Sequence, residues 1–144
     1  ADVPPDRVVD PGGRDGCRAP IPWTSAPGRG GPTDPWLPFP PEADTRSVEA
    51  QRADPGSMLH LYRDLLALRR SSHALALGSQ EQIDAPDGVL AWRRTGDDGS
   101  YVVAVNFTDA PVRWDLPGEL VLGSAPGTVD GTLPAAGAVI LRPT

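Results

Sequence analysis

The chain has 144 residues, 39% of them hydrophobic, and a formal net charge of −6. All 13 basic residues are arginines, and they are scattered along the chain, which argues against a nucleic-acid partner. A single cysteine, Cys17, excludes an internal disulfide, and the spacing of a cysteine–histidine metal site is missing. Cys17 is interpreted as a packed thiol inside its loop. We therefore expect no metal, no cofactor and a reducing, cytoplasmic setting. No stretch approaches the ~20 apolar residues of a membrane span, so we expect no membrane partner.

Residues 1–53 show almost no periodicity and hold most of the prolines. The chain starts without methionine, which suggests a fragment. Three aromatic residues, Trp23, Trp36 and Phe39, favour an ordered loop over disorder because they require burial or a ligand. The loop also carries Arg14 and Arg18, whose planar guanidinium groups suit carboxylates and adjacent hydroxyls. The chemistry alone leaves two roles open for them, ligand binding and structural ion pairing.

A helix is predicted over residues 55–72. Asp54 has the residue type of an N-cap, and Pro55 suits the first helical position. Apolar residues follow at helical spacing, and Arg69 and Arg70 complement the dipole at the C-terminal end. An apolar face this broad must pack against something large.

From residue 78 onward the pattern is that of β-structure. Residues 89–94 and 101–107 are rich in valine and aromatic residues, and they flank residues 95–100, which are predicted to form the turn of a hairpin. Shorter strands are predicted at 77–83, 112–115, 119–122 and 138–142, and turn signals at 86–88 and 116–118 separate several of them. This spacing predicts an antiparallel sandwich or a small barrel.

Four sequence blocks in this order resemble one family. They are RDGCRAPIPW at residues 14–23, DPWLP at 34–38, VEAQ at 48–51 and DPGSMLHLYRDLLALRR at 54–70. Together they resemble the C-terminal part of α-glucosidases of glycoside hydrolase family 13, in the oligo-1,6-glucosidase-like branch. The β-region, with Val105-Asn106-Phe107 after its hairpin, is similar to the C-terminal domain of that family.

The resemblance implies an architecture. Residues 1–72 would be the end of a (β/α)8 barrel, with 1–53 as the long loop after its eighth strand and 55–72 as its eighth helix. Residues 78–144 would be an antiparallel β-sandwich domain. The missing N-terminal part of the barrel would then be the structural partner of this chain, and the loop would lie at the face where barrel enzymes build their active sites.

The resemblance also implies an activity, the removal of terminal non-reducing α-linked glucose from oligosaccharides by a retaining mechanism. Retaining glycosidases use two carboxyl groups roughly 5–5.5 Å apart. In the family these groups lie on earlier strands, so none of the catalytic residues falls in this chain, and we expect the chain alone to be inactive. The linkage preference and the choice between hydrolysis and glucose transfer stay open.

The substrate-binding candidates are Arg14 and Arg18. Arg14 matches the family arginine that holds hydroxyls of the terminal glucose together with an upstream aspartate. Arg18 matches a second arginine, for which a loop-bracing ion pair is the alternative, and Asp15 is interpreted as a partner for such an arginine. Trp23 and Trp36 are expected to anchor the loop to the barrel more than to stack on sugar rings. Many relatives have threonine and methionine where this chain has Ala19 and Ile21, which leaves contacts with the leaving sugar open.

Two other classes of function are weighed against an enzyme fragment. A free-standing carbohydrate-binding β-module would use the arginine loop and the tryptophans as its site, but it would leave the apolar face of the predicted helix bare. A proline-rich interaction segment would need a repeated Pro-x-x-Pro register, which this sequence lacks.

Overall fold

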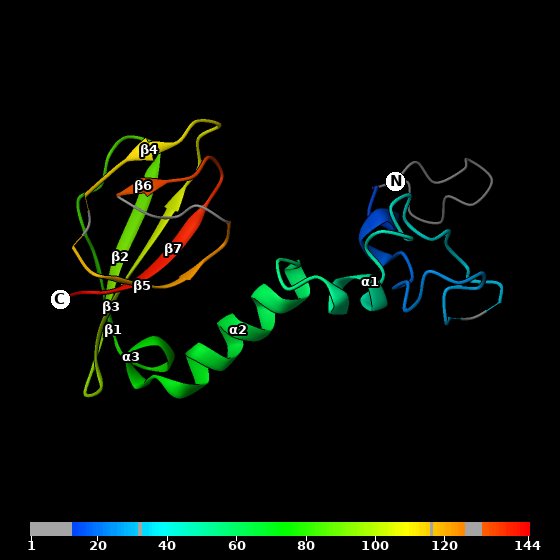
Figure 1. Ribbon diagram of the computed structural model, residues 1–144, viewed down its shortest axis with the longest axis horizontal. Coiled ribbons are helices and arrows are strands. Elements are labelled where there is room, and N and C mark those ends of the chain that lie inside the picture. The colour runs from blue at the N-terminus through cyan, green and yellow to red at the C-terminus, as the bar shows by residue number, and fades with distance from the viewer. Residues whose placement is uncertain (1–12, 32, 116, 126–130) are drawn as a thin grey trace. The chain divides into compact units, whose positions relative to one another are not determined.

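The computed structural model describes residues 13–31, 33–115, 117–125 and 131–144. The chain divides into two compact units, Ala1–His60 and Leu61–Thr144 (Figure 1). The predicted loop residues 1–12 and Pro32, and Leu116 of a predicted turn, lie outside the described residues. Each unit is described by itself below.

The described part of the first unit holds two short helices within the segment predicted as an uninterrupted loop. These are the 3-10 helix η2 (Asp15–Arg18) and the α-helix α1 (Val48–Ala53). The prediction missed α1, although Ser47 caps it by accepting a hydrogen bond from the backbone N–H of Ala50 at 3.1 Å. Leu37, Ala43 and Ser47 are fully buried, so this proline-rich unit has an ordered interior.

The long helix α2 spans Met58–Ser71 and begins later than predicted. Asp54 does not cap it, because its carboxylate accepts from the N–H of Gly56 at 2.9 Å in a turn that precedes the helix. Ser57, directly before the helix, accepts from the N–H of His60 at 3.5 Å, and the side chain of Gln51 accepts from the N–H of Leu59 at 3.1 Å. The residues predicted as the first helical turn therefore form a connection between α1 and α2.

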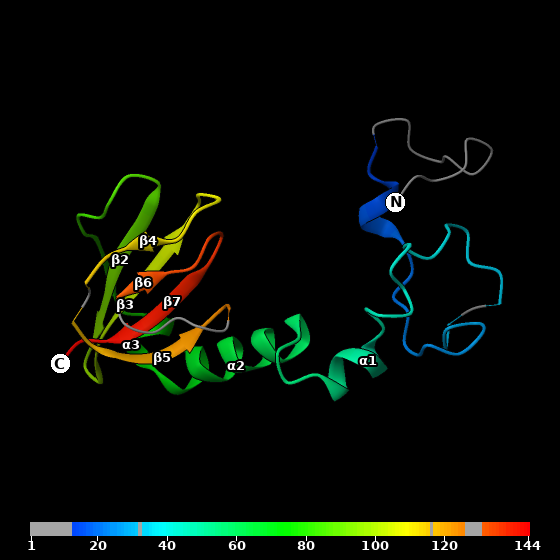
Figure 2. The same cartoon turned by 45° about the horizontal axis from the view of Figure 1, so that its top comes forward.

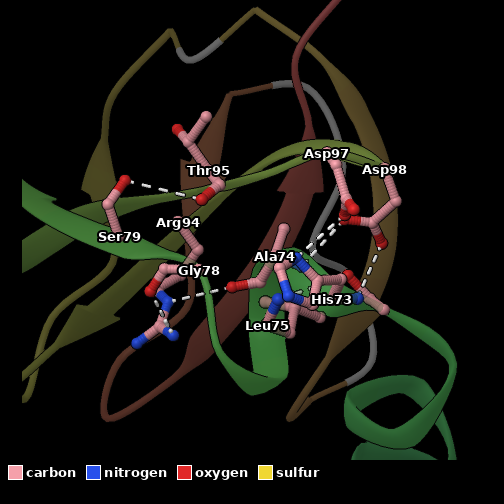
Figure 3. A network of polar contacts seen from close by, with 10 residues as sticks. His73, Ala74, Leu75, Gly78, Ser79, Arg94, Thr95, Asp97 and Asp98 are labelled. Atoms are coloured by element: carbon pink, nitrogen blue, oxygen red, sulfur yellow. Dashed lines mark hydrogen bonds and ion pairs between the residues drawn. The ribbon is translucent and has the colours of Figure 1, made fainter.

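A further helix that was not predicted, α3 (His73–Ala76), follows directly. Four residues are too few to hold a helix without help, and side chains bind both of its ends (Figure 3). At its start, Asp98 accepts from the N–H groups of His73 at 2.9 Å and Ala74 at 2.8 Å. At its end, the guanidinium of Arg69 donates to the carbonyls of Leu75 and Ala76, and that of Arg94 donates to the carbonyl of Ala74.

The second unit is built on a five-stranded antiparallel sheet in the order β1-β2-β3-β7-β5, and a pair of short strands, β4 and β6, accompanies it (Figures 1 and 2). The sheet strands are β1 (Ser79–Gln82), β2 (Val89–Gly96), β3 (Gly99–Asn106), β5 (Glu119–Gly123) and β7 (Ala138–Arg142). The separate pair is β4 (Val112–Arg113) with β6 (Thr132–Leu133).

The predicted antiparallel β-region is confirmed, with corrections to its details. The hairpin strands are longer than predicted and close on a tight turn at Asp97-Asp98, where Gly96 pairs with Gly99. Gly99 has φ +120°, a backbone conformation that favours glycine. The strand β6 was not predicted, because its two residues carry no alternating pattern of their own.

The sheet packs on both faces. On one face, Ala91, Ala104 and Val139 form a buried cluster with Leu133 of β6, and Trp114 packs against it. On the other face, Tyr101 is buried against Ala74 and Leu75 of α3, with Leu68 of α2 beside them. Among the residues that the structure describes, no helix is long and apolar enough to cross a membrane.

Candidate functional site

The two predicted site residues lie on one short turn of the first unit. Arg14 directly precedes η2 and Arg18 is its last residue, and both side chains are exposed. The carbonyl of Arg14 accepts hydrogen bonds from the N–H of Cys17 at 3.2 Å and from its thiol at 2.9 Å. Cys17, interpreted from the sequence as a packed thiol, is exposed. Asp15, between the arginines, is buried.

The chain leaves this turn in an extended conformation and is then held by the start of α1. Ala19 has φ −57° and ψ 145°, which suits the prolines that follow. The carbonyl of Pro22 accepts from the N–H of Val48 at 2.9 Å, and that of Trp23 accepts from the N–H of Glu49 at 3.0 Å. These N–H groups belong to the first turn of a helix and have no partner within it, so the loop satisfies them.

A carboxylate reinforces the same contact. Both the N–H and the hydroxyl of Ser25 donate to the Glu49 side chain, each at 3.0 Å. These two hydrogen bonds lower the pKa of the Glu49 carboxyl, because they favour its charged form. We call the contacts of residues 22–25 with 48–49 the loop clasp. The loop clasp brings residues 22–25 next to residues 48–49 and so closes the chain between them into one compact loop.

An ion pair lies inside that loop. The guanidinium of Arg29 donates to the carboxylate of Asp44 and lies 5.8 Å from the centre of the Phe39 ring. The carbonyl of Arg29 accepts from the N–H groups of Trp23 and Thr24. The loop is thus ordered by polar contacts more than by a large apolar core.

Three large apolar side chains of the loop before α1, Ile21, Trp23 and Trp36, are exposed. Exposed aromatic faces and guanidinium groups on one ordered loop are the components that sugars require, namely stacking surfaces and hydrogen-bond donors to hydroxyls. Arg14 and Arg18 lie together on one turn at η2. Trp36 belongs to a later part of the loop.

Among the described residues, His73, Asp97 and Asp98 form the group whose ligand atoms come within 4.8 Å of one another. Contacts that stabilise the start of α3 explain why these three side chains lie close together. Asp98 uses both carboxylate oxygens on the N–H groups at the start of α3, and Asp97 pairs with the imidazole of His73 at 2.8 Å. Both Asp98 oxygens and one Asp97 oxygen are therefore engaged in contacts within the chain.

Comparison with known proteins relates both units to carbohydrate-active enzymes. Residues 77–140 match a family model described as "Domain of unknown function (DUF3459)". A "Probable alpha-glucosidase" of Rhizobium meliloti (strain 1021) is 37% identical over 106 residues, which are 73% of this chain and 19% of that protein. The "Oligo-1,6-glucosidase" of Halalkalibacterium halodurans is 33% identical over 114 residues, or 76% of this chain and 20% of that protein.

The chain is related to the C-terminal part of family 13 glycoside hydrolases. A solved structure agrees with this relationship. The trehalulose synthase MutB from Pseudomonas mesoacidophila MX-45 matches 90% of this chain with a TM-score of 0.78 and 29% identity, over 26% of its own length. A variant of MutB has been solved with its substrate sucrose. The chain spans only about a fifth to a quarter of these family 13 relatives.

Sequence reasoning found the arginines of this family 13 segment and missed the loop clasp. Glu49 appeared only as part of a sequence block, and nothing singled out Ser25, Arg29 or Asp44. The partners Ser25 and Glu49 are 24 positions apart, so no local spacing reveals them. The Ser47 cap of α1 was the available signal, because it fixes where the N–H groups of Val48 and Glu49 point.

Proposed function

We propose that this chain is the C-terminal part of an α-glucosidase that releases terminal non-reducing α-linked glucose from oligosaccharides. The observation that carries the proposal is the 37% identity, over 73% of this chain, to a protein named as a probable α-glucosidase. The proposed substrates are α-glucoside oligosaccharides. The proposed compartment is the cytoplasm, where the exposed Cys17 thiol would stay reduced.

In this proposal residues 1–72 complete a (β/α)8 barrel and residues 78–144 form the β-domain. The helix α2 supports it. Met58, Tyr62 and Leu66 are spaced by one helical turn, lie on one face and are exposed. A helix with such a stripe requires an apolar neighbour, and the rest of a barrel would supply one.

The proposed reaction is of the retaining type and needs a nucleophilic carboxylate and an acid/base carboxyl group. Both would lie in the part of the enzyme that precedes residue 1. The proposed contribution of this chain is recognition: guanidinium groups that hold sugar hydroxyls at the rim of the barrel.

Arg14 is assigned to the hydroxyls of the terminal glucose, and Arg18 is assigned to the same site. A glucose unit held at a closed end of the pocket explains release of one sugar at a time. The alternative for Arg18, bracing of the loop, predicts a different result. If Arg18 braces the loop, Arg18→Ala would lower the melting temperature of the enzyme. If Arg18 contacts the substrate, Arg18→Ala would lower kcat/KM and leave the melting temperature unchanged.

A free-standing carbohydrate-binding module is the competing function. Such a module would use the same arginines and tryptophans, but it has no use for the exposed stripe of α2. An apolar stripe without a partner would reduce solubility. The enzyme fragment is therefore the better account of α2.

The test of the proposed function is made in the longer enzyme that contains this chain. We expect Arg14→Ala to lower kcat/KM on a chromogenic α-glucoside by a factor that corresponds to about 1.5–3 kcal/mol, the range for loss of a hydrogen bond to a charged group. Arg14→Lys should recover only part of the loss, because lysine lacks the planar fork. Arg52→Ala is the matched control, since Arg52 is an exposed arginine of α1 in the same unit.

An unchanged kcat/KM in Arg14→Ala would refute the binding role of Arg14. Absence of turnover of any α-glucoside by the longer wild-type enzyme would refute the proposed function itself.

A further inference from the structure

The loop clasp combines backbone hydrogen bonds with the side chain of Glu49. The carbonyl of Pro22 accepts from the N–H of Val48 at 2.9 Å. The carbonyl of Trp23 accepts from the N–H of Glu49 at 3.0 Å. One carboxylate oxygen of Glu49 then accepts from both the N–H and the hydroxyl of Ser25, each at 3.0 Å. Glu49 therefore holds the segment that follows the arginines with its backbone and with its side chain.

The chain between the loop clasp and the turn at η2 is stiff. The rings of Pro20 and Pro22 fix φ at those positions. Ala19 has φ −57° and ψ 145°, the conformation of an extended polyproline segment. Such a segment keeps its direction over several residues. A movement of residues 22–25 is therefore transmitted to Arg18, the last residue of η2.

The turn at η2 is itself closed by hydrogen bonds. The carbonyl of Arg14 accepts from the N–H of Cys17 at 3.2 Å and from its thiol at 2.9 Å. These bonds tie the backbone before η2 to the residue next to Arg18. Arg14 and Arg18 therefore follow residues 19–22 together, and both depend on where the loop clasp holds the chain.

The other side of the loop clasp is fixed to the start of α2. The hydroxyl of Ser57 donates to the carbonyl of Gln51 at 2.7 Å, and the side chain of Gln51 accepts from the N–H of Leu59 at 3.1 Å. The Nε2 atom of His60 lies 3.2 Å from the carbonyl oxygen of Arg52. The short helix α1 is thus a fixed support for the loop clasp, and Glu49 is a residue of that support.

We propose that Glu49 is a positioning residue, which holds the turn of Arg14 and Arg18 in the place where the substrate is bound. Glu49 acts through the loop clasp and does not itself contact the substrate. This inference rests on the proposed function, because it requires that Arg14 binds hydroxyls of the terminal glucose. What the role needs is an acceptor oxygen opposite Ser25, and an amide oxygen has the two lone pairs to accept both bonds.

The first test measures kcat/KM of variants of the longer enzyme on a chromogenic α-glucoside, well below the melting temperature of each variant. We expect Glu49→Ala to lower kcat/KM at least about fivefold, since a shift of ~1 Å in a binding group can cost about 10²-fold. Glu49→Gln should stay within about twofold of the wild type, because its amide oxygen replaces the acceptor. Glu42→Ala is the matched control. Glu42 is an exposed acid of the same loop outside the loop clasp, so kcat/KM should not change.

The same replacement in an Arg14→Ala background separates positioning from a general loss of stability. If Glu49 acts through the arginine turn, Glu49→Ala should lower kcat/KM by a clearly smaller factor once Arg14 is absent, because a missing guanidinium cannot be displaced. An equal factor in both backgrounds would overturn the proposal. Equal losses in Glu49→Gln and Glu49→Ala would overturn it as well, because the charge itself would then be required.

Alkylation of Cys17 by iodoacetamide reports on the same turn without an activity assay. Residue-resolved mass spectrometry of the folded longer enzyme measures its rate. We expect several-fold faster alkylation in Glu49→Ala than in the wild type, because a turn without its anchor releases the thiol from the carbonyl of Arg14 more often. Glu42→Ala should leave the rate unchanged. Equal rates in Glu49→Ala and the wild type would contradict the proposal.

Ser25→Ala is the milder variant if Glu49→Ala does not fold. It removes the hydroxyl donor and keeps the N–H, so Cys17 alkylation should accelerate by a smaller factor, and an unchanged rate would refute the proposal. The wild-type assay separates this inference from the proposed function. An active enzyme in which Glu49→Ala changes neither kcat/KM nor alkylation refutes the inference and leaves the proposed function intact. An inactive wild type in which Glu49→Ala accelerates alkylation refutes the proposed function and supports the hold of Glu49 on the turn.

Discussion

At the scale of single residues, Asn106 shows how a pattern in the sequence can mislead. Asn106-Phe107-Thr108 has the spacing of an N-glycosylation acceptor. The side chain is only 1% exposed. Its amide nitrogen donates to the carbonyls of Ala110 and Pro134, each at 2.9 Å, and its oxygen accepts from the N–H of Thr108. Asn106 therefore links the end of β3 to the turn after it and to the residue after β6.

Replacing this amide should be costly. Asn106→Asp removes both donors and places a carboxylate against two carbonyls, so we expect the free energy of unfolding to fall by at least about 1–3 kcal/mol. Urea unfolding followed by circular dichroism measures the loss. Asp109→Asn, at an exposed position of the same turn, should change little. A loss no greater in Asn106→Asp than in that control would contradict the role given to Asn106.

At the scale of elements, the short helix α3 depends on groups from outside it. Asp98 binds its first N–H groups, and Arg69 and Arg94 bind its last carbonyls, which matches the charge that each helix end prefers. The sheet also approaches closely. A Cβ atom on Gly96 would come within 2.6 Å of the backbone nitrogen of Ala74. The helix is thus part of the β-domain and connects it to α2.

This arrangement predicts a dependence of stability on pH. The hydroxyl of Ser72 first, and then the N–H groups of Ala74 and His73, lower the pKa of Asp98 below its ordinary value of 3.8. The stabilisation from Asp98 is therefore complete above that ordinary pKa and is lost as the pH falls through the lowered one. We expect wild type to be more stable than Asp98→Asn at pH 7 and the difference to shrink in acid. Urea titrations at both pH values measure it.

The exposed Asp87→Asn supplies the comparison for this titration, since Asp87 lies in the turn before β2. A stability difference for Asp98→Asn that is the same at neutral and acidic pH would contradict the proposed cap.

At the scale of the whole molecule, two apolar surfaces call for further structure. One is the stripe of Met58, Tyr62 and Leu66 on α2, and the other is the part of the β-domain that exposes Leu90 and Phe107. The relatives are several times longer than the aligned segment, and in the proposed enzyme the rest of the barrel covers the stripe on α2.

The chain alone should lack glycosidase activity, because the proposed catalytic carboxylates lie outside it. We expect no turnover of a chromogenic α-glucoside above background by the purified chain, and measurable turnover by the longer enzyme under the same conditions. Turnover by this chain that is abolished in Arg14→Ala would show that it contains a complete site, and the fragment proposal would be wrong.

Local patterns in the sequence determined the hairpin and the long helix. The runs of strand-forming residues at 89–94 and 101–107 flank their own turn, and the apolar residues of α2 repeat at helical spacing. The same local blocks identified the family relationship. Such features are readable because neighbours in the sequence supply most of their stabilisation.

Only the tertiary structure decided the short elements and the order of the loop. α3 depends on Asp98, which lies 24 positions from Ala74, and β6 depends on its pairing with β4. The arginine loop is held by Ser25 and Glu49, equally far apart in sequence, while its length and prolines alone indicated only an ordered irregular segment. A helix or strand of a few residues cannot stabilise itself, so it forms where the fold brings distant donors and acceptors to its ends.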